Sequence, residues 1–448
     1  MSEKTVVGLA GVSFHAFWGF SEEQYRERIE EMRAVVERLG ARLVALPETF
    51  KDAKGGVAAA QRMNDEADLV ILDVATFPEG SATLAFFDNL AKPLVLWGRN
   101  EQEHGSNIGH NSFCGVNFLA GNLALRGQRF RKLYGAPGDV RLQNRLKTAI
   151  TLIGAAKKAS GSRIGLFGEG IVPKFYDIDI SDSDREKLKQ RWDIDFMGIP
   201  TRDLTELVDS FSIGEVGEEI ETIETRFGKI EVSADAVEAQ ARLLKALKKI
   251  SAENGFSAIA IRCWPELQST REVWPCPSIS ILNDLALPAA CEGDVGGAFD
   301  MLLASKFSEE PSTLLDVIDW NDEKDRFSVW HCGPTAPSWA DKSGSVFKYH
   351  NVDGRDEDGG AKFGCSGIID MQFKPGPVSL YRTLGALDDE FAVQGEIVTT
   401  ETEKVCGSFG QVANATIYGR GMDNELLRNQ IFDRCLPHHF AAVRGSLY

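Results

Sequence analysis

Carboxylates in apolar surroundings are the first residues of this sequence that point to chemistry. Glu292 and Asp294 stand in the small, apolar segment Pro288–Val295, and Asp316 interrupts the apolar run Leu314–Ile318. Aspartate and glutamate are almost never fully buried unless they are paired or bind a metal. Any one of these acids alone fits a strand-end cap or a surface loop as well.

Histidines supply a second kind of ligand. His438 and His439 stand in tandem after Pro437, and His331 ends a strand-like segment just before Gly333. Neutral imidazole is the commonest metal ligand, although a satisfied core histidine is the usual explanation for a single one. Several acids and two histidine sites near strand ends together predict one metal site with oxygen and nitrogen ligands. Such a site suits Mn²⁺, Mg²⁺, Fe²⁺ or Zn²⁺.

Two further acids, Asp319 and Asp322, compete with Asp316 for a place in this site. Both lie nearer a polar turn, so we interpret them as solvated acids. The 8 cysteines are scattered without a Cys-x-x-Cys pair. This spacing predicts free thiols in a reducing, cytoplasmic compartment rather than a zinc knuckle or a redox motif.

Composition and missing motifs exclude several other classes of function. The 448 residues carry 66 acidic and 49 basic side chains, a net charge of −17, which disfavours nucleic-acid and membrane-surface partners. No apolar run approaches the ~20 residues that span a bilayer, and the first residues lack a signal-peptide pattern. Gly-x-Gly-x-x-Gly, the phosphate-binding loop and Gly-x-Ser-x-Gly are all absent, so neither nucleotide binding nor a nucleophile elbow is predicted.

The elements that must position these residues follow an α/β order. Short apolar strands alternate with amphipathic helices from the N-terminus, and the pattern restarts near residue 160. A capping box at Ser21–Gln24 opens the first long helix, and Gly255 ends a strong helix over 236–254. Nearly continuous apolar strands separated by helices predict parallel sheets that are covered on both faces.

The pattern changes after about Pro311, where helices become rare and turn residues frequent. Short strands are predicted at 326–330, 367–372, 378–383, 391–399 and 415–418, followed by a last helix near 423–433. The fold class is therefore two Rossmann-like α/β domains followed by a β-rich, antiparallel, barrel-like C-terminal domain. The predicted domains are 1–160, 161–310, which carries Glu292, and 311–448, which carries His438 and His439.

In the order and spacing of these motifs the sequence resembles the superfamily of L-fucose and L-arabinose isomerases, which are metal-dependent aldose–ketose isomerases. The resemblance rests on the segment Ala290–Asp294, on Asp316 twenty-four residues after Glu292, on His331, and on the late pair His438-His439. The segments Trp274-Pro275-Cys276-Pro277, Leu282-Asn283-Asp284 and Phe373–Val378 are also similar to family segments. These matches cover about 260–440, and the N-terminal third resembles the family only in its strand–helix order.

The resemblance implies a role for each motif. The metal ligands would be Glu292, Asp316, His331 and His439, with Mn²⁺ as the expected ion and Mg²⁺, Co²⁺ or another divalent metal as alternatives. An aspartate at 316 favours the fucose-type branch, whereas His331 favours the arabinose-type branch. Substrate contacts are expected from His438, Asp294, Trp274 and Trp330, although Asp294 equally fits an orienting or loop-capping residue. Family members are oligomers with active sites near subunit boundaries, so a homo-oligomer is expected.

The predicted chemistry is interconversion of an aldose and its ketose through a cis-enediol. A metal polarises the carbonyl, and two carboxyl groups move a proton between C1 and C2. Glu292 and Asp316 are the expected pair. The substrate is a fucose-like, arabinose-like or modified hexose. A phosphorylated or sulfonated sugar would need basic side chains, for which the candidates are Arg99, Arg262, Arg271 and Arg444.

Two other classes of function stay open at this point. A sugar-binding protein without catalytic activity also uses paired α/β domains around a cleft, but it leaves the acid and histidine set unexplained. A metal-dependent sugar hydrolase or aldolase would use the same ligands and would cleave its substrate.

Overall fold

The computed structural model describes residues 4–17, 19–101, 103–104, 107–168, 176–263, 267, 273–349, 367–399 and 405–448. The chain forms two compact units. The first contains Met1–Lys158, Thr383–Phe391 and Tyr448, and the second contains Ala159–Arg382 and Ala392–Leu447. The described part of the chain holds no helix with the length and apolar character needed to cross a bilayer.

The first unit is built on a five-stranded parallel sheet in the order β2-β1-β3-β4-β7. Its strands are β1 (Val6–Val12), β2 (Arg42–Ala45), β3 (Leu69–Val74), β4 (Leu94–Gly98) and β7 (Arg131–Tyr134). Strands β1, β3 and β4 are buried along their whole length, as the sequence predicts for a sheet covered on both faces.

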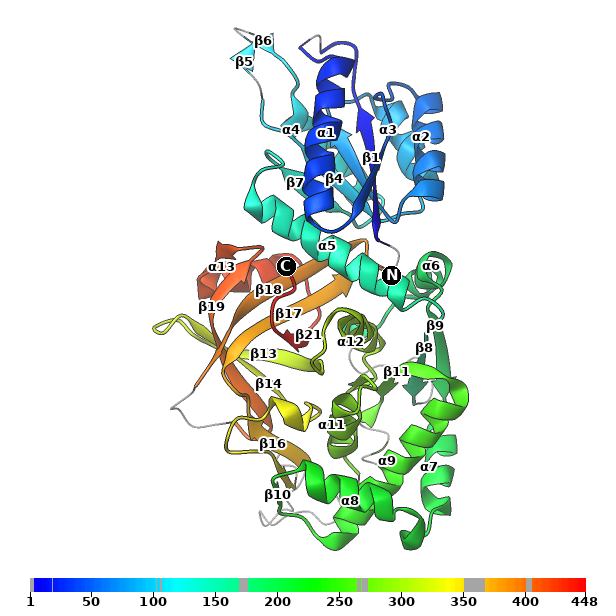
Figure 1. Ribbon diagram of the computed structural model, residues 1–448, viewed down its shortest axis with the longest axis vertical. Helices are drawn as coiled ribbons and strands as arrows, with labels where there is room; N and C mark the ends of the chain where they lie inside the picture. The colour runs from blue at the N-terminus through cyan, green and yellow to red at the C-terminus, as the bar shows by residue number, and fades with distance from the viewer. Residues whose placement is uncertain are drawn as a thin grey trace. The chain divides into compact units, whose positions relative to one another are not determined.

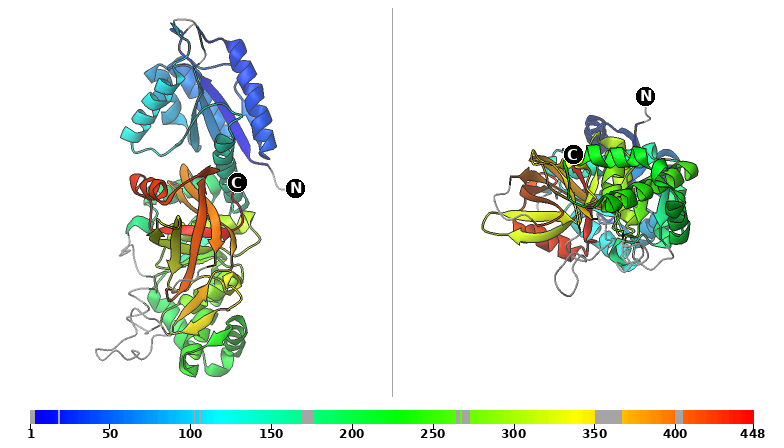
Figure 2. Two further views of the ribbon diagram at one scale, coloured as in Figure 1. Left: turned by 90° about the vertical axis from the view of Figure 1, so that its left-hand side faces the viewer. Right: turned by 90° about the horizontal axis from the view of Figure 1, so that it is seen from below.

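The helices of this unit are α1 (Glu22–Arg38), α2 (Ala53–Glu66), α3 (Gly80–Asn89), α4 (Ser112–Leu125) and α5 (Val140–Lys158). Helix α1 lies on one face of the sheet, and α2 and α3 lie on the other (Figures 1 and 2). The predicted capping box is confirmed. The Ser21 hydroxyl accepts the Gln24 amide at 3.2 Å, and the Gln24 side chain accepts the Ser21 amide at 2.8 Å. A small hairpin pairs β5 (Glu103–His104) with β6 (Asn107–Ile108).

The second unit contains a four-stranded parallel sheet in the order β12-β11-β8-β9. The strands are β8 (Arg163–Phe167), β9 (Asp195–Ile199), β11 (Phe256–Ile261) and β12 (Ala289–Ala290). Its helices are α6 (Asp182–Trp192), α7 (Thr201–Ser210), α8 (Gly217–Arg226), α9 (Ala234–Asn254), α11 (Cys276–Asp284) and α12 (Val295–Phe307). Helix α9 ends where predicted, because Gly255 adopts a left-handed conformation with φ 65°.

A barrel of antiparallel strands follows, and most of its residues belong to the second unit. Six strands, β19-β14-β13-β21-β17-β18, pair in this order, and a β18–β19 pairing closes the ring. They are β13 (Thr313–Asn321), β14 (Arg326–His331), β17 (Gly376–Leu384), β18 (Asp389–Val398), β19 (Ser408–Ile417) and β21 (His439–Arg444). Beyond the ring, the sheet continues through β16 (Ile368–Gln372), β15 (Val346–Lys348) and β10 (Lys229–Ile230), while β20 (Arg420–Gly421) pairs with β19.

The predicted fold class is confirmed, since parallel α/β sheets precede an antiparallel, barrel-like sheet. The last helix, α13 (Asn424–Asp433), is also present. The predicted strand at 415–418 is longer than expected, because β19 begins at Ser408. The predicted domain boundaries at 160 and 310 fall between sheets, and the division into three domains stays a prediction.

Candidate active site

Three neighbouring barrel strands and one loop bring the predicted ligands together within the second unit. Asp316 lies on β13, directly opposite His439 of β21 on one side and Trp330 of β14 on the other. His331 is the last residue of β14. Glu292 lies in the loop between β12 and α12. Residues separated by more than a hundred positions in the sequence thus become neighbours through strand register.

The ligand atoms of these residues converge around His439. Its Nε2 atom lies 3.5 Å from Asp316 Oδ1 and 3.8 Å from Glu292 Oε2. The rings of His331 and His439 have their centroids 5.1 Å apart. Ligand atoms of Glu292, His331 and His439 all lie within 4.8 Å of one another, and so do those of Asp316, His438 and His439.

Three of these atoms are buried polar atoms without a hydrogen-bond partner: Asp316 Oδ1, His331 Nε2 and His439 Nε2. A buried polar atom left unpaired costs about 1–3 kcal/mol. A divalent cation would satisfy Asp316 Oδ1 and His439 Nε2 together, and His331 Nε2 as well once that nitrogen is deprotonated; carboxylate and imidazole are ligands that Mn²⁺ accepts. The residues at this point therefore fit a metal ion.

Asp294 supports His439 from behind. Its carboxylate accepts His439 Nδ1–H at 3.0 Å and two bonds from Arg382 at 2.9 and 3.0 Å. It also caps α12 by accepting the Gly297 amide at 2.6 Å. The hydrogen bond at Nδ1 leaves Nε2 free to face the site, which is how carboxylates orient metal-bound histidines.

The charges around Asp294 are deeply buried. Asp294 is fully buried and Arg382 is 3% exposed. Burial alone would raise the pKa of Asp294, but the Arg382 guanidinium and the His439 ring hold this pKa far below its ordinary value. Asp294 is therefore a permanent anion. Because its oxygens are engaged by protein donors, we interpret it as an orienting residue.

His438 bridges two acids. Its Nδ1 atom lies 2.6 Å from Asp177 Oδ2, and its Nε2 atom lies 3.7 Å from Glu292 Oε2. Burial would lower the pKa of His438, but hydrogen bonds with Glu292 and Asp177 raise it to about 9. Burial would likewise raise the pKa of Glu292, but His438 and the neighbouring rings lower it. Near neutral pH the site thus pairs an imidazolium with an ionised glutamate.

Sequence reasoning did not identify Asp177 or Arg382. Asp177 belongs to the short 3₁₀ helix η1 (Tyr176–Ile178) and also accepts the His438 amide at 2.9 Å. Arg382 lies on β17, where a charge would be taken for an exposed position. Neither residue stands in a recognisable motif, because each is identified only by its partner far away in the chain.

Trp330 and Trp274, the two tryptophans predicted to contact the substrate, lie in different surroundings. The Trp330 ring lies nearly parallel to that of His331, with 6.2 Å between centroids, and its indole donates to the Cys406 carbonyl at 2.8 Å. Trp274 is buried, and its carbonyl accepts the Gln240 side chain at 2.6 Å. Asp319 is exposed and Asp322 pairs with Arg428 at 2.8 Å, in agreement with their interpretation as solvated acids.

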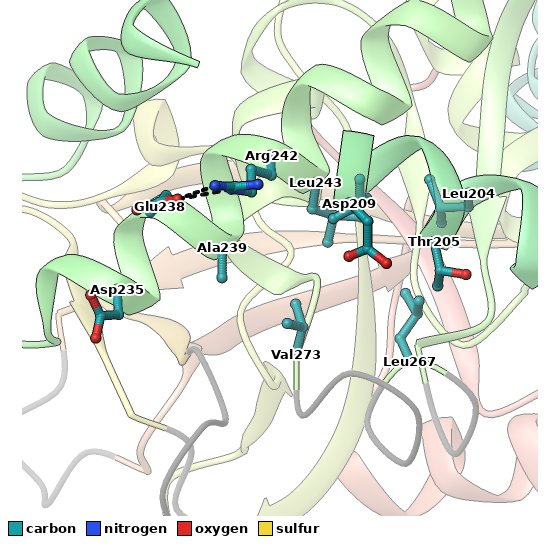
Figure 3. Close-up of a pocket in the computed structure, with 11 residues that line it drawn as sticks. Leu204, Thr205, Asp209, Asp235, Glu238, Ala239, Arg242, Leu243, Leu267 and Val273 are labelled. Atoms are coloured by element: carbon teal, nitrogen blue, oxygen red, sulfur yellow. Dashed lines mark hydrogen bonds and ion pairs between the residues drawn. The ribbon is translucent and has the colours of Figure 1, made fainter. Parts of the chain in front are cut away.

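A separate pocket of about 420 Å³ lies on the second unit between α7 and α9 (Figure 3). Its lining includes Leu204, Asp209, Asp235 and Leu243, with Glu238 and Arg242 paired to each other. None of the predicted site residues lines this pocket.

The backbone at Glu292 is unusual. Glu292 has φ 60° and Gly293 has φ 72°, so two consecutive residues adopt the left-handed conformation. For a residue with a side chain this conformation costs about 1–2 kcal/mol. Residues in such strained conformations cluster at functional sites.

This strain gives a stability prediction. In metal-free protein, Glu292→Gly is expected to be about 1 kcal/mol more stable than Glu292→Ala, because glycine alone tolerates this φ without cost. Urea unfolding of the two variants measures the difference. Glu309 has no positive φ, so glycine should be less stable than alanine there. If the glycine and alanine variants had the same order of stability at both positions, the prediction would be contradicted.

The sequence of this chain is similar to those of known sugar isomerases. The chain is 28% identical over 290 residues to a sulfoquinovose isomerase of Alkalicoccus urumqiensis, a match that covers 63% of this chain and 63% of that enzyme. It is 25% identical over 324 residues to a sulfoquinovose isomerase of Priestia aryabhattai, covering 71% of this chain and 69% of that enzyme. The chain thus matches less than two thirds of the first of these relatives. These relatives confirm the resemblance to sugar isomerases predicted from the motifs.

Two other comparisons add no argument. No family model matches the chain. Among solved structures, a probable maltose operon transcriptional repressor of Staphylococcus aureus covers 69% of this chain and 93% of that chain at 11% identity. Its TM-score of 0.18 carries nothing about fold or function.

Proposed function

We propose that this protein is a divalent-metal-dependent aldose–ketose isomerase that acts on a sulfonated hexose. The observation that carries the proposal is the convergence of Glu292, Asp316 and His439, with unpaired buried atoms on the last two. The sulfoquinovose isomerases supply the reaction class and the sulfonated substrate.

We assign the metal ligands to Glu292, Asp316, His331 and His439, with Mn²⁺ as the expected ion. A divalent ion bound there supplies Lewis-acid polarisation of the sugar carbonyl. His331 can act as a metal ligand only if its Nε2 atom is deprotonated. Its Nδ1 now accepts the Cys332 amide at 2.8 Å, so a neutral ring in this arrangement carries its proton on Nε2. Ligation through Nε2 requires that proton to leave.

The proton transfer belongs to the two carboxylates. The His438 and His439 rings lie close to Glu292 Oε2, and the lowered pKa of Glu292 keeps it ionised. Its Oε2 atom can therefore accept the proton from one sugar carbon. Asp316 Oδ1 lies 3.5 Å from His439 Nε2, and once Asp316 has taken up a proton from solvent it can donate that proton to the adjacent carbon, while Glu292 releases its own proton to solvent. Such general acid–base action contributes about 10²–10⁴-fold to the rate. The charged His438 ring fixes Glu292 and can donate to a sugar oxygen.

Arg262 is the basic residue that we assign to the sulfonate. Its aliphatic stem packs against Gly293 and Gly168, so closely that a Cβ on Gly293 would lie 2.5 Å from Arg262 Cγ. Arg262 therefore lies beside the loop that carries Glu292. Of the other candidates, Arg444 lies at the opposite end of β21 from His439, Arg99 lies in the first unit, and Arg271 lies outside the described residues.

Arg262→Gln is expected to raise the KM for a sulfonated hexose about 10–100-fold, since a hydrogen bond to a charged group contributes about 1.5–3 kcal/mol. The KM for the same sugar with a hydroxyl in place of the sulfonate should change little, and Arg262→Lys should retain part of the selectivity. Steady-state kinetics with the two sugars measures this difference. An equal loss for both substrates would contradict a role in sulfonate binding.

The function is tested by incubating Mn²⁺-loaded protein with a panel of aldoses in D₂O and following C1 and C2 by NMR. The panel contains sulfonated and phosphorylated hexoses, glucose, fucose and arabinose. Ketose formation from the sulfonated sugar, lost after chelation and restored by Mn²⁺, is the expected result, with deuterium entering from solvent. Cleavage of the sugar would favour a hydrolase or aldolase. Metal-free binding without turnover would favour a sugar-binding protein.

The predicted homo-oligomer and the predicted cytoplasmic compartment remain part of this proposal. Sedimentation of the purified protein tests the first of them.

A further inference from the structure

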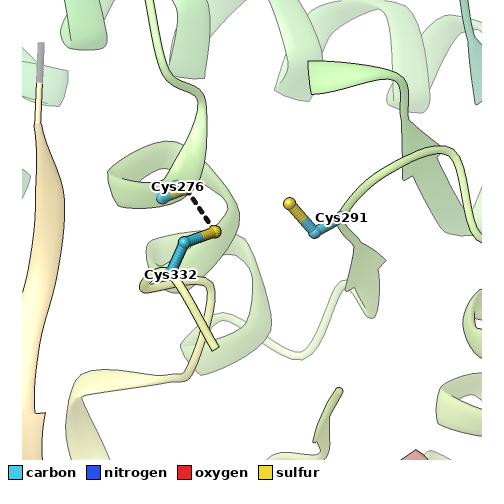
Figure 4. Close-up of side chains that lie close together, drawn as sticks. All are labelled: Cys276, Cys291 and Cys332. Atoms are coloured by element: carbon cyan, nitrogen blue, oxygen red, sulfur yellow. Dashed lines mark hydrogen bonds between the residues drawn. The ribbon is translucent and has the colours of Figure 1, made fainter. Parts of the chain in front are cut away.

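A second group of potential metal ligands consists only of thiols. Cys276, Cys291 and Cys332, here called the thiol cluster, offer sulfur atoms that all lie within 4.8 Å of one another. The Cys276 and Cys332 sulfurs are 3.4 Å apart, and Cys291 points its sulfur toward this pair (Figure 4). A fourth thiol, Cys263, lies 3.3 Å from Cys291. All four are free and buried.

Three separate segments of the second unit carry the thiol cluster. Cys276 is the first residue of α11, Cys291 follows β12, and Cys332 follows β14. Both Cys291 and Cys332 adjoin a residue of the candidate active site, namely Glu292 and His331. The spacing of the cysteines in the sequence shows none of this.

One buried asparagine ties the three segments together. Asn283 of α11 donates to the Ala289 carbonyl at 3.1 Å and to the Pro334 carbonyl at 2.9 Å, and it accepts the Ala289 amide at 2.7 Å. Ala289 lies two residues before Cys291, and Pro334 lies two residues after Cys332. The thiols are thus held in place by a hydrogen-bonded scaffold.

Buried thiols often serve only as small apolar side chains. What distinguishes this cluster is its geometry. Three thiolates around one ion at metal–sulfur distances of about 2.3 Å have sulfurs about 4 Å apart. The Cys276 and Cys332 sulfurs lie 3.4 Å apart and all three sulfurs lie within 4.8 Å of one another, so shifts of less than about 1 Å bring them to that spacing. The Cys332 sulfur also lies 3.2 Å from His331 Nδ1, so a ring nitrogen borders the cluster.

We propose that the thiol cluster binds one thiophilic cation, Zn²⁺ or Cu⁺, with Cys276, Cys291 and Cys332 as ligands. Each thiol releases its proton to solvent as its sulfur–metal bond forms, and nothing is oxidised or reduced. Ligand softness then separates two kinds of ion on one chain. Oxygen and nitrogen ligands around His439 suit Mn²⁺, whereas thiolates select zinc and cuprous ions.

The test uses Cd²⁺ as an optical probe, because thiolate binding gives a sulfur-to-metal charge-transfer band in the ultraviolet. The parent protein carries Cys114→Ser and Cys435→Ser, which remove the two thiols that are exposed among the described residues, and Cys365→Ser, since Cys365 lies outside them. It is loaded with Mn²⁺ and titrated with Cd²⁺. The band is expected to saturate at one equivalent. Added Zn²⁺ or Cu⁺ should bleach it, and the ion that competes at lower concentration identifies the native occupant.

Cys291→Ser and Cys332→Ser in this parent should each lose most of the band, while Cys406→Ser should retain it. Circular dichroism checks that each variant is folded, and Cys276→Ala replaces any variant that is not. A folded parent without the band overturns the proposal, and so does a band that survives both serine substitutions. The readout is independent of isomerase turnover, so failure of the proposed function would leave this result interpretable.

Discussion

Replacing Glu292 by glutamine is expected to reduce isomerase turnover by a factor of about 10²–10⁴ while leaving the protein folded. Glutamine has the same shape but cannot accept the substrate proton, and as a neutral ligand it binds a cation more weakly. The loss should appear mainly in kcat, because the group acts in the proton transfer itself. Saturation kinetics with the sulfonated hexose, at fixed Mn²⁺, measures it.

Two controls test whether the loss of turnover is specific to Glu292 and whether it comes from loss of the metal ion. Glu309→Gln changes an exposed glutamate of the same unit and should leave kcat unchanged. Metal binding by Glu292→Gln, followed by Mn²⁺ spectroscopy, separates loss of the ion from loss of the base. Near-normal turnover by a folded Glu292→Gln protein would remove Glu292 from the mechanism.

The second large effect concerns stability. Asp294→Asn is expected to lower the free energy of unfolding by up to about 3–5 kcal/mol, because the buried Arg382 guanidinium then loses its nearest carboxylate and keeps the more distant Asp300, 3.8 Å away. It also weakens the support of His439, since an amide is a poorer acceptor for its Nδ1–H. Urea unfolding gives the energy, and Mn²⁺ titration gives the accompanying loss of metal affinity.

The matched control is Asp423→Asn. Asp423 caps α13 by accepting the Leu426 amide at 2.8 Å, but it is exposed. Asparagine caps helices as well as aspartate does, so this change should cost only a few tenths of a kcal/mol. Adding Arg382→Met to Asp294→Asn should cost less than the sum of the single changes, because the direct interaction between these two side chains is then lost only once. Strict additivity would show that the pair is not coupled.

The sequence was sufficient to predict the architecture for physical reasons. Burial of β1, β3 and β4 on both faces leaves continuous apolar runs, and the capping residues at Ser21 and Gly255 mark helix ends by local hydrogen bonding alone. Glu292, Asp316 and His439 were identifiable because a charged or basic residue in an apolar run needs a partner.

The strands that carry the site were harder to predict. β13 carries a register shift between Val317 and Asp319, which breaks the alternation of buried and exposed residues by which a strand is recognised. β21 is buried over His439–Val443 and has no alternation at all. The Asp294–Arg382 pair and the thiol cluster depend on long-range packing, which leaves no local pattern in the sequence.

The position of β21 in the barrel has a consequence for how the protein is made. His439 begins this strand, which pairs with β13 on one side and β17 on the other, and every other strand of the ring precedes it in the chain. The ribosome therefore synthesises Glu292, Asp316 and His331 well before β21, the strand that completes the ring. During synthesis the nascent chain lacks the residue around which the ligand atoms converge. Metal capture is thus expected to follow synthesis of β21, and insertion of this strand into the ring is the step that creates the site.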